Sequence, residues 1–220
     1  LDAAKAYEAD IILGITTRTA DAEGEILEQR AVTAGRAEID AVLTRFLGIG
    51  KQIPPMYSAL KRDGTPLYVL ARRGEIVERA PRTIEISALV LRSFNGGRLK
   101  LGIVCSKGTY VRTLAEDIGA ALGCGAHLAG LRRTATGALR VEDASTLGEL
   151  EPMSELERDR LLVRADRVLG ALPRIDLDEA LARRFCLGQA VAPSGVPDGI
   201  SRVYGPGGRF LGLGEAAGGA

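Results

Sequence analysis

Apolar side chains recur along the chain with two periods, and each period predicts one kind of element. Continuous or alternating apolar runs predict strands at residues 9–14, 82–91 and 97–106. Apolar positions three and four apart predict helices at residues 35–48 and 113–122. The inward faces of these two helices would carry Ile39, Val42, Leu43, Phe46 and Leu47 in the first, and Leu114, Ile118, Ala121 and Leu122 in the second.

Glycine and proline residues mark the expected element boundaries. Gly48 should cap the first helix, and Gly123 should end the second. The residues "RSFNGG" at 92–97 predict a hairpin turn between two strands. Thr65-Pro66 should begin a short helix that Gly74 ends.

The order of these elements predicts an α+β fold with flanking helices on an antiparallel or mixed sheet. Residues 129–139 read as a further strand region with a basic pair, and residues 151–174 are charged and helical without a strand signal. After Pro173 a short helix precedes Gly/Pro-rich short strands. We therefore expect a boundary at 173/174, with one domain at 1–173 and a small β domain at 174–220.

Composition is that of a globular protein with a locally basic surface. The 220 residues are 46% hydrophobic, and no apolar run reaches the length of a membrane span. Residues 51–112 hold twelve Lys/Arg against four Asp/Glu, a local charge of +8, whereas the remainder carries −7. Such asymmetry suggests a polyanionic partner, RNA or DNA, and a solvated basic face is an equal alternative on charge alone.

Several kinds of chemistry are disfavoured by the residues present. The chain has no G-x-S-x-G, P-loop or H-E-x-x-H motif. Cys124 and His127 have half the spacing of a zinc site, but no second pair follows, and a turn after a helix is the simpler interpretation. Residues 19–24 resemble a calcium loop only faintly, since Arg30 stands where the twelfth-position glutamate belongs. We expect no metal and no cofactor, and three widely spaced cysteines indicate a reducing compartment.

Tyr110 and Arg112 form the most suggestive local pair. If this stretch is extended, residues two apart point the same way, and a phenol beside a guanidinium can stack a base and bind a carboxylate or phosphate. Lys107-Gly108 just before them suits a phosphate-binding turn. The alternative is a tyrosine in the core and an arginine at the sheet edge.

Four segments carry a resemblance to a known family. They are "AYEADIILGITTRTADAEGE", "QIPPMYSALKRDGTPLYVLARRG", "CSKGTYVRTLAEDIGAALGCGAHLAGLRRTATG" and the terminal "GRFLGLGE". In order and spacing they resemble the TruB family of tRNA pseudouridine synthases, which isomerise uridine 55 in the T-loop. The resemblance covers essentially the whole chain, and its last part is similar to the family's small PUA-like RNA-binding domain.

The resemblance implies roles for four residues in a pocket without a cofactor. Tyr7 would stack on the flipped uracil and act as the C5 base, and Tyr110 would line the same pocket. Arg112 would pair with a nucleophilic aspartate, and Leu131 would form part of an apolar wall. The simpler alternatives are a packing aromatic on an edge strand for Tyr7 and a core residue for Leu131.

The segment at about 52–83 is similar to the arm with which the family grips the T-loop. Pro54-Pro55 excludes a helix there, and Tyr57, Lys61 and Arg72 are the expected RNA contacts, together with Lys107. Lys61 and Arg72 could equally be solvated charges.

One part of the family pattern is absent from the 220 residues. The catalytic aspartate lies in a Gly-x-Leu-Asp-Pro segment before the tyrosine, and no such segment occurs here. We therefore expect a truncated sequence that is inactive alone, belonging to a monomeric cytoplasmic isomerase that acts on the tRNA T-arm. The alternatives are a non-catalytic RNA-binding or RNA-folding module and a guide-RNA-dependent relative.

Overall fold

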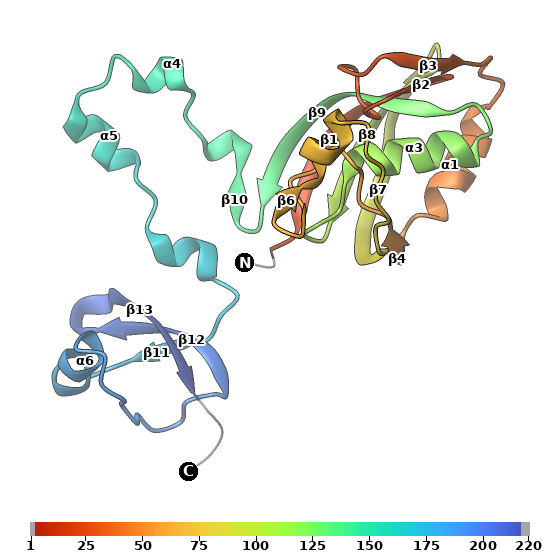
Figure 1. Cartoon of the computed structure of the whole chain (residues 1–220). Helices are drawn as coiled ribbons and strands as arrows, with labels where there is room; N and C mark the ends of the chain where they lie inside the picture. Colours follow the sequence, from red (N-terminus) through yellow and green to blue (C-terminus); the bar gives the residue numbers. More distant parts are fainter. Residues whose placement is uncertain (1–2, 217–220) are drawn as a thin grey trace. The chain divides into compact units, whose positions relative to one another are not determined.

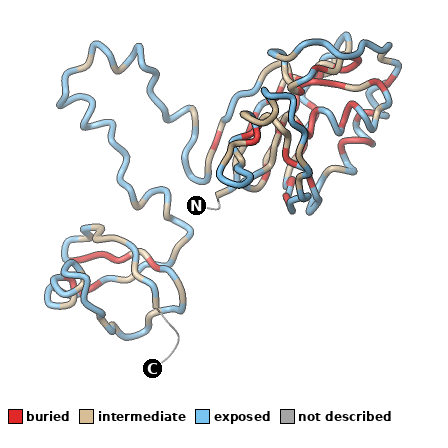
Figure 2. Tube along the Cα trace, viewed as in Figure 1, coloured by how far each residue is buried: buried red, intermediate tan, exposed pale blue. Residues whose placement is uncertain are grey.

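The computed structural model describes residues 3–216, which form two compact units divided between Asp143 and Ala144 (Figure 1). No residue between 144 and 173 is buried, and this segment is drawn almost entirely as exposed in Figure 2. Contacts within the chain group this segment with the second unit. The domain boundary that the sequence predicts at 173/174 therefore stays a prediction.

The first unit is built on a six-stranded antiparallel sheet, which confirms the predicted α+β class. Its strands lie in the order β10-β9-β1-β8-β7-β4. They span β1 Lys5–Leu13, β4 Gly48–Gln52, β7 Arg82–Asn95, β8 Arg98–Cys105, β9 Ala126–Thr136 and β10 Leu139–Arg140. Two small hairpins, β2 Ile15–Thr17 with β3 Ile26–Gln29 and β5 Lys61–Arg62 with β6 Thr65–Pro66, accompany the sheet, and a short 3-10 turn, η1 Val141–Asp143, follows it.

Strand β1 lies between β8 and β9, and its alternating pattern decides which face of the sheet is covered. Tyr7, Ala9, Ile11 and Leu13 are all buried in one core cluster with residues of the helices. Those helices are α1 Arg36–Thr44 and α3 Val111–Ala121, while a third helix, α2 Leu67–Arg72, buries Leu67 outside this cluster. Tyr7 was expected just before the strand, yet it lies inside it, because pairing with β8 and β9 already begins at Lys5.

Three helix boundaries differ from the prediction. Helix α1 ends at Thr44, and Gly48 begins the edge strand β4 instead of capping the helix. Helix α2 lies where expected, but Thr65 does not cap it, since Pro66 occupies the N-cap position. Helix α3 begins at Val111, two residues earlier than predicted, with Tyr110 as its extended N-cap residue.

The hairpin between β7 and β8 confirms the prediction from "RSFNGG". Gly96 and Gly97 both have positive φ, 55° and 80°, which glycine adopts without a steric penalty. Strand β9 begins earlier than residue 129, because its pairing with β1 extends to Ala126. His127 is therefore a buried strand residue, not part of a turn, and its Nδ1 lies 2.9 Å from the Ile15 carbonyl oxygen.

The second unit has a three-stranded sheet of order β11-β12-β13. Short helices precede it, as expected for residues 151–174, and its core is small, centred on Leu177, Ala182 and Val203. Among residues 3–216 no helix is long and apolar enough to cross a membrane. The elements span α4 Leu147–Leu150, α5 Glu155–Leu161, η2 Ala165–Leu169, β11 Arg174–Asp176, α6 Glu179–Cys186, β12 Gly199–Gly205, η3 Pro206–Gly208 and β13 Arg209–Ala216.

Candidate active site

Tyr7 lies on the covered face of the sheet with a planar cation against its ring. It is paired with Arg133 on β9, and the Arg133 guanidinium carbon lies 5.5 Å from the centroid of the Tyr7 ring. The pairing of β1 with β9 is irregular between Ala6 and Tyr7 and again between Asp10 and Ile11. Such bulges turn side chains and are common beside active sites.

Leu131 lies on the same face of the sheet as Tyr7, at a place where this face is no longer covered by other residues. It pairs with Ala9 of β1, so its side chain points to the same side of the sheet as Tyr7. Ala9 is fully buried, whereas Leu131 is 48% exposed. Leu131 is thus not a core residue, and it forms an apolar rim beside the buried tyrosine.

Arg112 joins three segments that are far apart in the sequence. Its Nη1 donates to Asp21 Oδ2 at 2.8 Å and to the Thr19 carbonyl at 3.5 Å, and its Nη2 donates to the Tyr57 carbonyl at 2.6 Å. The side chains of Arg112 and Asp21 are 27% and 23% exposed. A guanidinium carries five N–H donors, so these contacts leave capacity for a further anion.

Asp21 is held in a tight loop by contacts to both carboxylate oxygens. Oδ2 accepts from Arg112, while Oδ1 accepts from the Thr19 hydroxyl at 2.5 Å and the Glu23 backbone N–H at 3.2 Å. Ala20 has a positive φ of 61°, which is costly for a residue with a Cβ atom. The loop therefore accepts backbone strain while it presents a carboxylate to Arg112.

Tyr110 is fixed through its backbone. Its N–H donates to Gln52 Oε1 at 2.8 Å, and its carbonyl accepts from Gln52 Nε2 at 3.1 Å. One turn beyond Arg112, Glu116 has its pKa raised by desolvation and by the neighbouring Asp117, with Arg112 and Arg79 opposing the shift. The start of α3 is thus a region of concentrated charge and fixed backbone.

Comparison with known proteins identifies the family. A family model described as TruB family pseudouridylate synthase (N terminal domain) matches residues 1–111. Residues 112–173 match the tRNA pseudouridylate synthase B C-terminal domain, and residues 173–220 match Pseudouridine synthase II TruB, C-terminal. The chain belongs to the TruB family.

Relatives of similar sequence support this TruB assignment along the whole chain. A tRNA pseudouridine synthase B of Cupriavidus metallidurans is 47% identical over 230 residues, covering 100% of this chain and 73% of the relative. One from Pseudomonas fluorescens is 51% identical over 222 residues, covering 99% and 73%. One from Burkholderia mallei is 50% identical over 224 residues, covering 99% and 74%.

Solved structures share the fold of this TruB-family chain. A chain in "Crystal Structure of a Cbf5-Nop10-Gar1 Complex" superposes with a TM-score of 0.71 at 23% identity, covering 98% of this chain. A chain in "Structure of H/ACA RNP bound to a substrate RNA containing 2'-deoxyuridine" gives 0.67 at 20% identity, also covering 98%. In both cases the chain spans 60% of the length of the solved chain.

The TruB-family chain places the expected pocket residues differently from the local sequence argument. Tyr110 and Arg112 do not share a face of an extended strand, because the helix begins between them at Val111. Arg112 instead sits in the first helical turn, where it reaches Asp21 and the Tyr57 carbonyl. Tyr7 and Leu131 share a sheet face through strand pairing.

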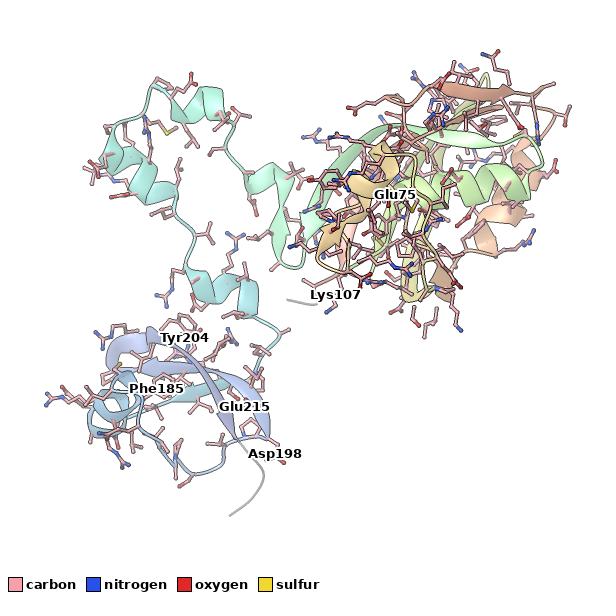
Figure 3. All side chains as sticks on the ribbon, viewed as in Figure 1. Glu75, Lys107, Phe185, Asp198, Tyr204 and Glu215 are labelled. Atoms are coloured by element: carbon pink, nitrogen blue, oxygen red, sulfur yellow. The ribbon has the colours of Figure 1, made fainter. Side chains whose placement is uncertain are left out.

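The residues of the arm that were expected to contact RNA are mostly at the surface. Lys61 in β5 and Arg72 in α2 are exposed, and the Arg72 guanidinium carbon lies 5.5 Å from the centroid of the Tyr68 ring. Tyr57 is half-buried and offers its carbonyl to Arg112. Lys107, labelled in Figure 3, is exposed in the turn between β8 and α3.

Sequence reasoning missed Asp21 and Gln52. Asp21 was considered only as part of a failed calcium loop, although a short polar loop between two strands is a common place for functional residues. Gln52 ends an edge strand just before Pro54-Pro55, and a buried glutamine at that point has to find partners for its amide. The sequence signal for Gln52 was its position just before Pro54-Pro55, because prolines restrict the backbone that follows it.

Proposed function

We propose that the protein isomerises uridine 55 in the T-loop of tRNA to pseudouridine. The reaction class follows from relatives that are 47–51% identical and named tRNA pseudouridine synthase B. Within the chain, the observation that supports it best is the Arg112 guanidinium fixed by Asp21 and two backbone carbonyls. An arginine held in this way can orient an incoming carboxylate without having to reorganise.

In the proposed mechanism, a nucleophilic aspartate detaches uracil from its ribose. The base rotates and is rejoined through C5, and the C5 proton then leaves. Arg112 keeps the nucleophilic carboxylate ionised and oriented, because a neighbouring cation favours the charged form. These 220 residues contain no Gly-x-Leu-Asp-Pro segment to supply that aspartate.

Asp21 is better suited to orienting Arg112 than to nucleophilic attack. Its two oxygens already accept hydrogen bonds from Arg112, Thr19 and Glu23. Three of the about four lone-pair positions of this carboxylate are therefore already used, two toward its own loop and one toward Arg112.

Tyr7, Tyr110 and Leu131 form the walls for the flipped base in this proposal. The Arg133 guanidinium carbon lies over the Tyr7 ring, 5.5 Å from its centroid, and a uracil ring would stack on the tyrosine in this proposal. The Tyr7 oxygen takes the C5 proton as a phenolate, and N1 of the detached uracil gains a proton in return. The exposed side chain of Leu131 excludes water from one side, as a flipped base requires.

The basic segment supplies the grip on RNA. Lys61, Arg72 and Lys107 are exposed and would contact phosphates, and Tyr57 sits where the arm meets Arg112. The arm is closed at its base by Arg79, whose Nη1 donates to the Pro54 carbonyl at 2.9 Å. We further propose that the protein acts as a monomer in the cytoplasm, and that residues 174–220 form a PUA-like RNA-binding domain.

The test uses the natural full-length protein with a tRNA transcript. We expect pseudouridine at position 55, read by carbodiimide labelling and primer extension, and none in a transcript with cytidine at that position. Tyr7→Phe keeps the ring but removes the hydroxyl, so deprotonation at C5 should slow by about 10²–10⁴-fold, the usual contribution of a general base. Salt-dependent RNA binding without any pseudouridine would instead support a non-catalytic RNA-binding module.

A further inference from the structure

Gln52 makes an unusual pair of contacts across the first unit. It is the last residue of the edge strand β4 and is 4% exposed, and its amide bonds both backbone groups of Tyr110, 58 residues away. The Tyr110 N–H can only donate and its carbonyl can only accept. A single orientation of the amide satisfies both, so the assignment of Oε1 and Nε2 is fixed by chemistry.

These bonds hold the start of helix α3. Tyr110 is the N-cap residue, with φ −98° and ψ 109°, and its side chain makes no capping hydrogen bond. Its carbonyl also accepts from the Leu114 N–H at 3.1 Å, the first bond of the helix. With both peptide groups around the Tyr110 Cα atom bonded, the direction of its Cα–Cβ bond is fixed.

We infer that Gln52 is a positioning residue for the proposed isomerisation. It holds Tyr110 and the first turn of α3, which carries Arg112, in the geometry that the flipped base and the nucleophilic carboxylate meet. This inference rests on the proposed function and extends it to a residue that lines neither the base nor the nucleophile.

Gln52 also ties the RNA-gripping arm to the pocket. The arm follows Gln52 directly through Ile53 and Pro54, and the Tyr57 carbonyl binds Arg112. The base of the arm and the start of α3 are therefore joined by two links, one through an amide and one through a guanidinium.

The first test is Gln52→Met in the natural full-length protein. Methionine has a similar length and volume but cannot replace either hydrogen bond, so Tyr110 should lose its fixed orientation. We expect kcat for pseudouridine formation to fall about 10–100-fold, as for small displacements of catalytic groups. The KM for tRNA should change less than about threefold, since the arm contacts remain. The matched control is Ile49→Thr on the same strand, where the side chain is 80% exposed, and it should behave as wild type.

Gln52→Glu supplies a readout that packing alone cannot give. A neutral carboxyl can accept from the Tyr110 N–H and donate to its carbonyl, whereas an ionised one faces that carbonyl with a negative charge. The ratio of variant to wild-type kcat should therefore rise as the pH is lowered, because burial disfavours the ionised carboxyl. The neighbouring ionisable groups are Arg82, opposite in register, and Arg45, Lys51 and Asp117 around a 200 Å³ cavity beside Gln52. Because these groups are present in both proteins, the ratio cancels their titration.

Amide hydrogen exchange tests the contact without activity. The Tyr110 N–H should be protected in the wild type and exchange freely in Gln52→Met, while the Leu114 N–H keeps its protection. Unchanged kcat, a flat pH ratio for Gln52→Glu and an unchanged Tyr110 amide would overturn the inference. A wild type that makes no pseudouridine would overturn the proposed function itself, which separates the two failures.

Discussion

Two aspartates, Asp21 in the first unit and Asp166 in the second, each bind an arginine and a hydroxyl group. The two clusters differ in which of these partners is distant in the sequence. Asp21 binds Arg112, 91 residues away, and the nearby Thr19 hydroxyl. Asp166 binds the nearby Arg164, and the Tyr204 hydroxyl 38 residues away at 2.6 Å. In the first cluster the distant partner is the charge, and in the second it is the hydroxyl.

The difference shows what each cluster holds in place. Arg112 is partly buried and binds two carbonyls besides Asp21, so the cluster fixes the position of this cation in the candidate active site. Arg164 is 65% exposed, whereas Tyr204 is fully buried in the second unit, where Figure 3 labels it. The second cluster therefore fastens the exposed segment before β11 to the small sheet, and its arginine contributes little as an exposed partner.

Replacing Arg112 should separate the two clusters most clearly. Arg112→Ala removes the cation that we propose to orient the nucleophile, and we expect kcat to fall by about 10²–10³-fold. Arg112→Lys keeps the charge but cannot reach Asp21 and the Tyr57 carbonyl together, so most of the loss should remain. Single-turnover rates on a tRNA transcript measure the effect, and normal turnover of Arg112→Ala would remove the catalytic role given to that residue.

Asp21→Asn tests whether the loop acts through Arg112. Asparagine keeps the shape and the turn contacts but loses the charge opposite the guanidinium. We expect kcat to fall about 10–100-fold, with little change in KM for tRNA. The double variant Asp21→Asn with Arg112→Ala should be no slower than Arg112→Ala alone, and additive losses would show that Asp21 acts independently.

The Tyr204 cluster should respond in stability and not in activity. Tyr204→Phe leaves the ring under Arg174, whose guanidinium carbon lies 4.0 Å from the ring centroid, but removes the hydroxyl that binds Asp166. The unfolding midpoint of the second unit should fall by about 4–8 °C, typical for one lost hydrogen bond in a unit of this size. Pseudouridine formation should stay unchanged, and a large loss of kcat would mean that the second cluster also serves the chemistry.

The smallest expected effect is a change in the stability of the second unit at acid pH. The Arg164 guanidinium, together with the Tyr204 hydroxyl, lowers the pKa of Asp166 from 3.8 to about 2. Its stabilising effect is therefore fully present above about pH 4 and is lost as the pH falls toward 2. Between pH 5 and pH 2 the midpoint of the second unit should fall further in the wild type than in Asp166→Asn, as followed by circular dichroism. Parallel curves for the two proteins would contradict this assignment.

Elements defined by short-range signals could be predicted from the sequence. The β7–β8 hairpin follows from Asn95-Gly96-Gly97, and helix α2 ends at Arg72, two residues before Gly74, which has the positive φ of 78° expected of a glycine after a helix end. The start of α3 could not be predicted in this way. Tyr110 is the N-cap residue of this helix, and its N–H donates to Gln52, which lies 58 residues earlier. A contact over that separation leaves no local pattern.

The candidate site shows the same division. Tyr7, Tyr110 and Arg112 could be selected from the sequence because they lie in recognisable segments, while Asp21 could not, since its role depends on a partner 91 residues away. For Leu131 the sequence left two interpretations, a core residue or part of an apolar wall, and its 48% exposure shows that it is not a core residue. Burial depends on what the rest of the chain covers, and residue type alone does not determine it.

The two irregularities in the pairing of β1 with β9 also set a rule for changes in chain length. Between them, the segment from Tyr7 to Asp10 pairs regularly with β9, and the alternation of its side chains places Tyr7 on the covered face of the sheet. Deleting one residue there would turn the tyrosine to the opposite face, because side chains alternate with a period of two. Deleting two would restore the face but move the ring about 6.6 Å along the strand. The length of this short stretch should therefore tolerate no variation, even in homologues whose loops differ freely in length.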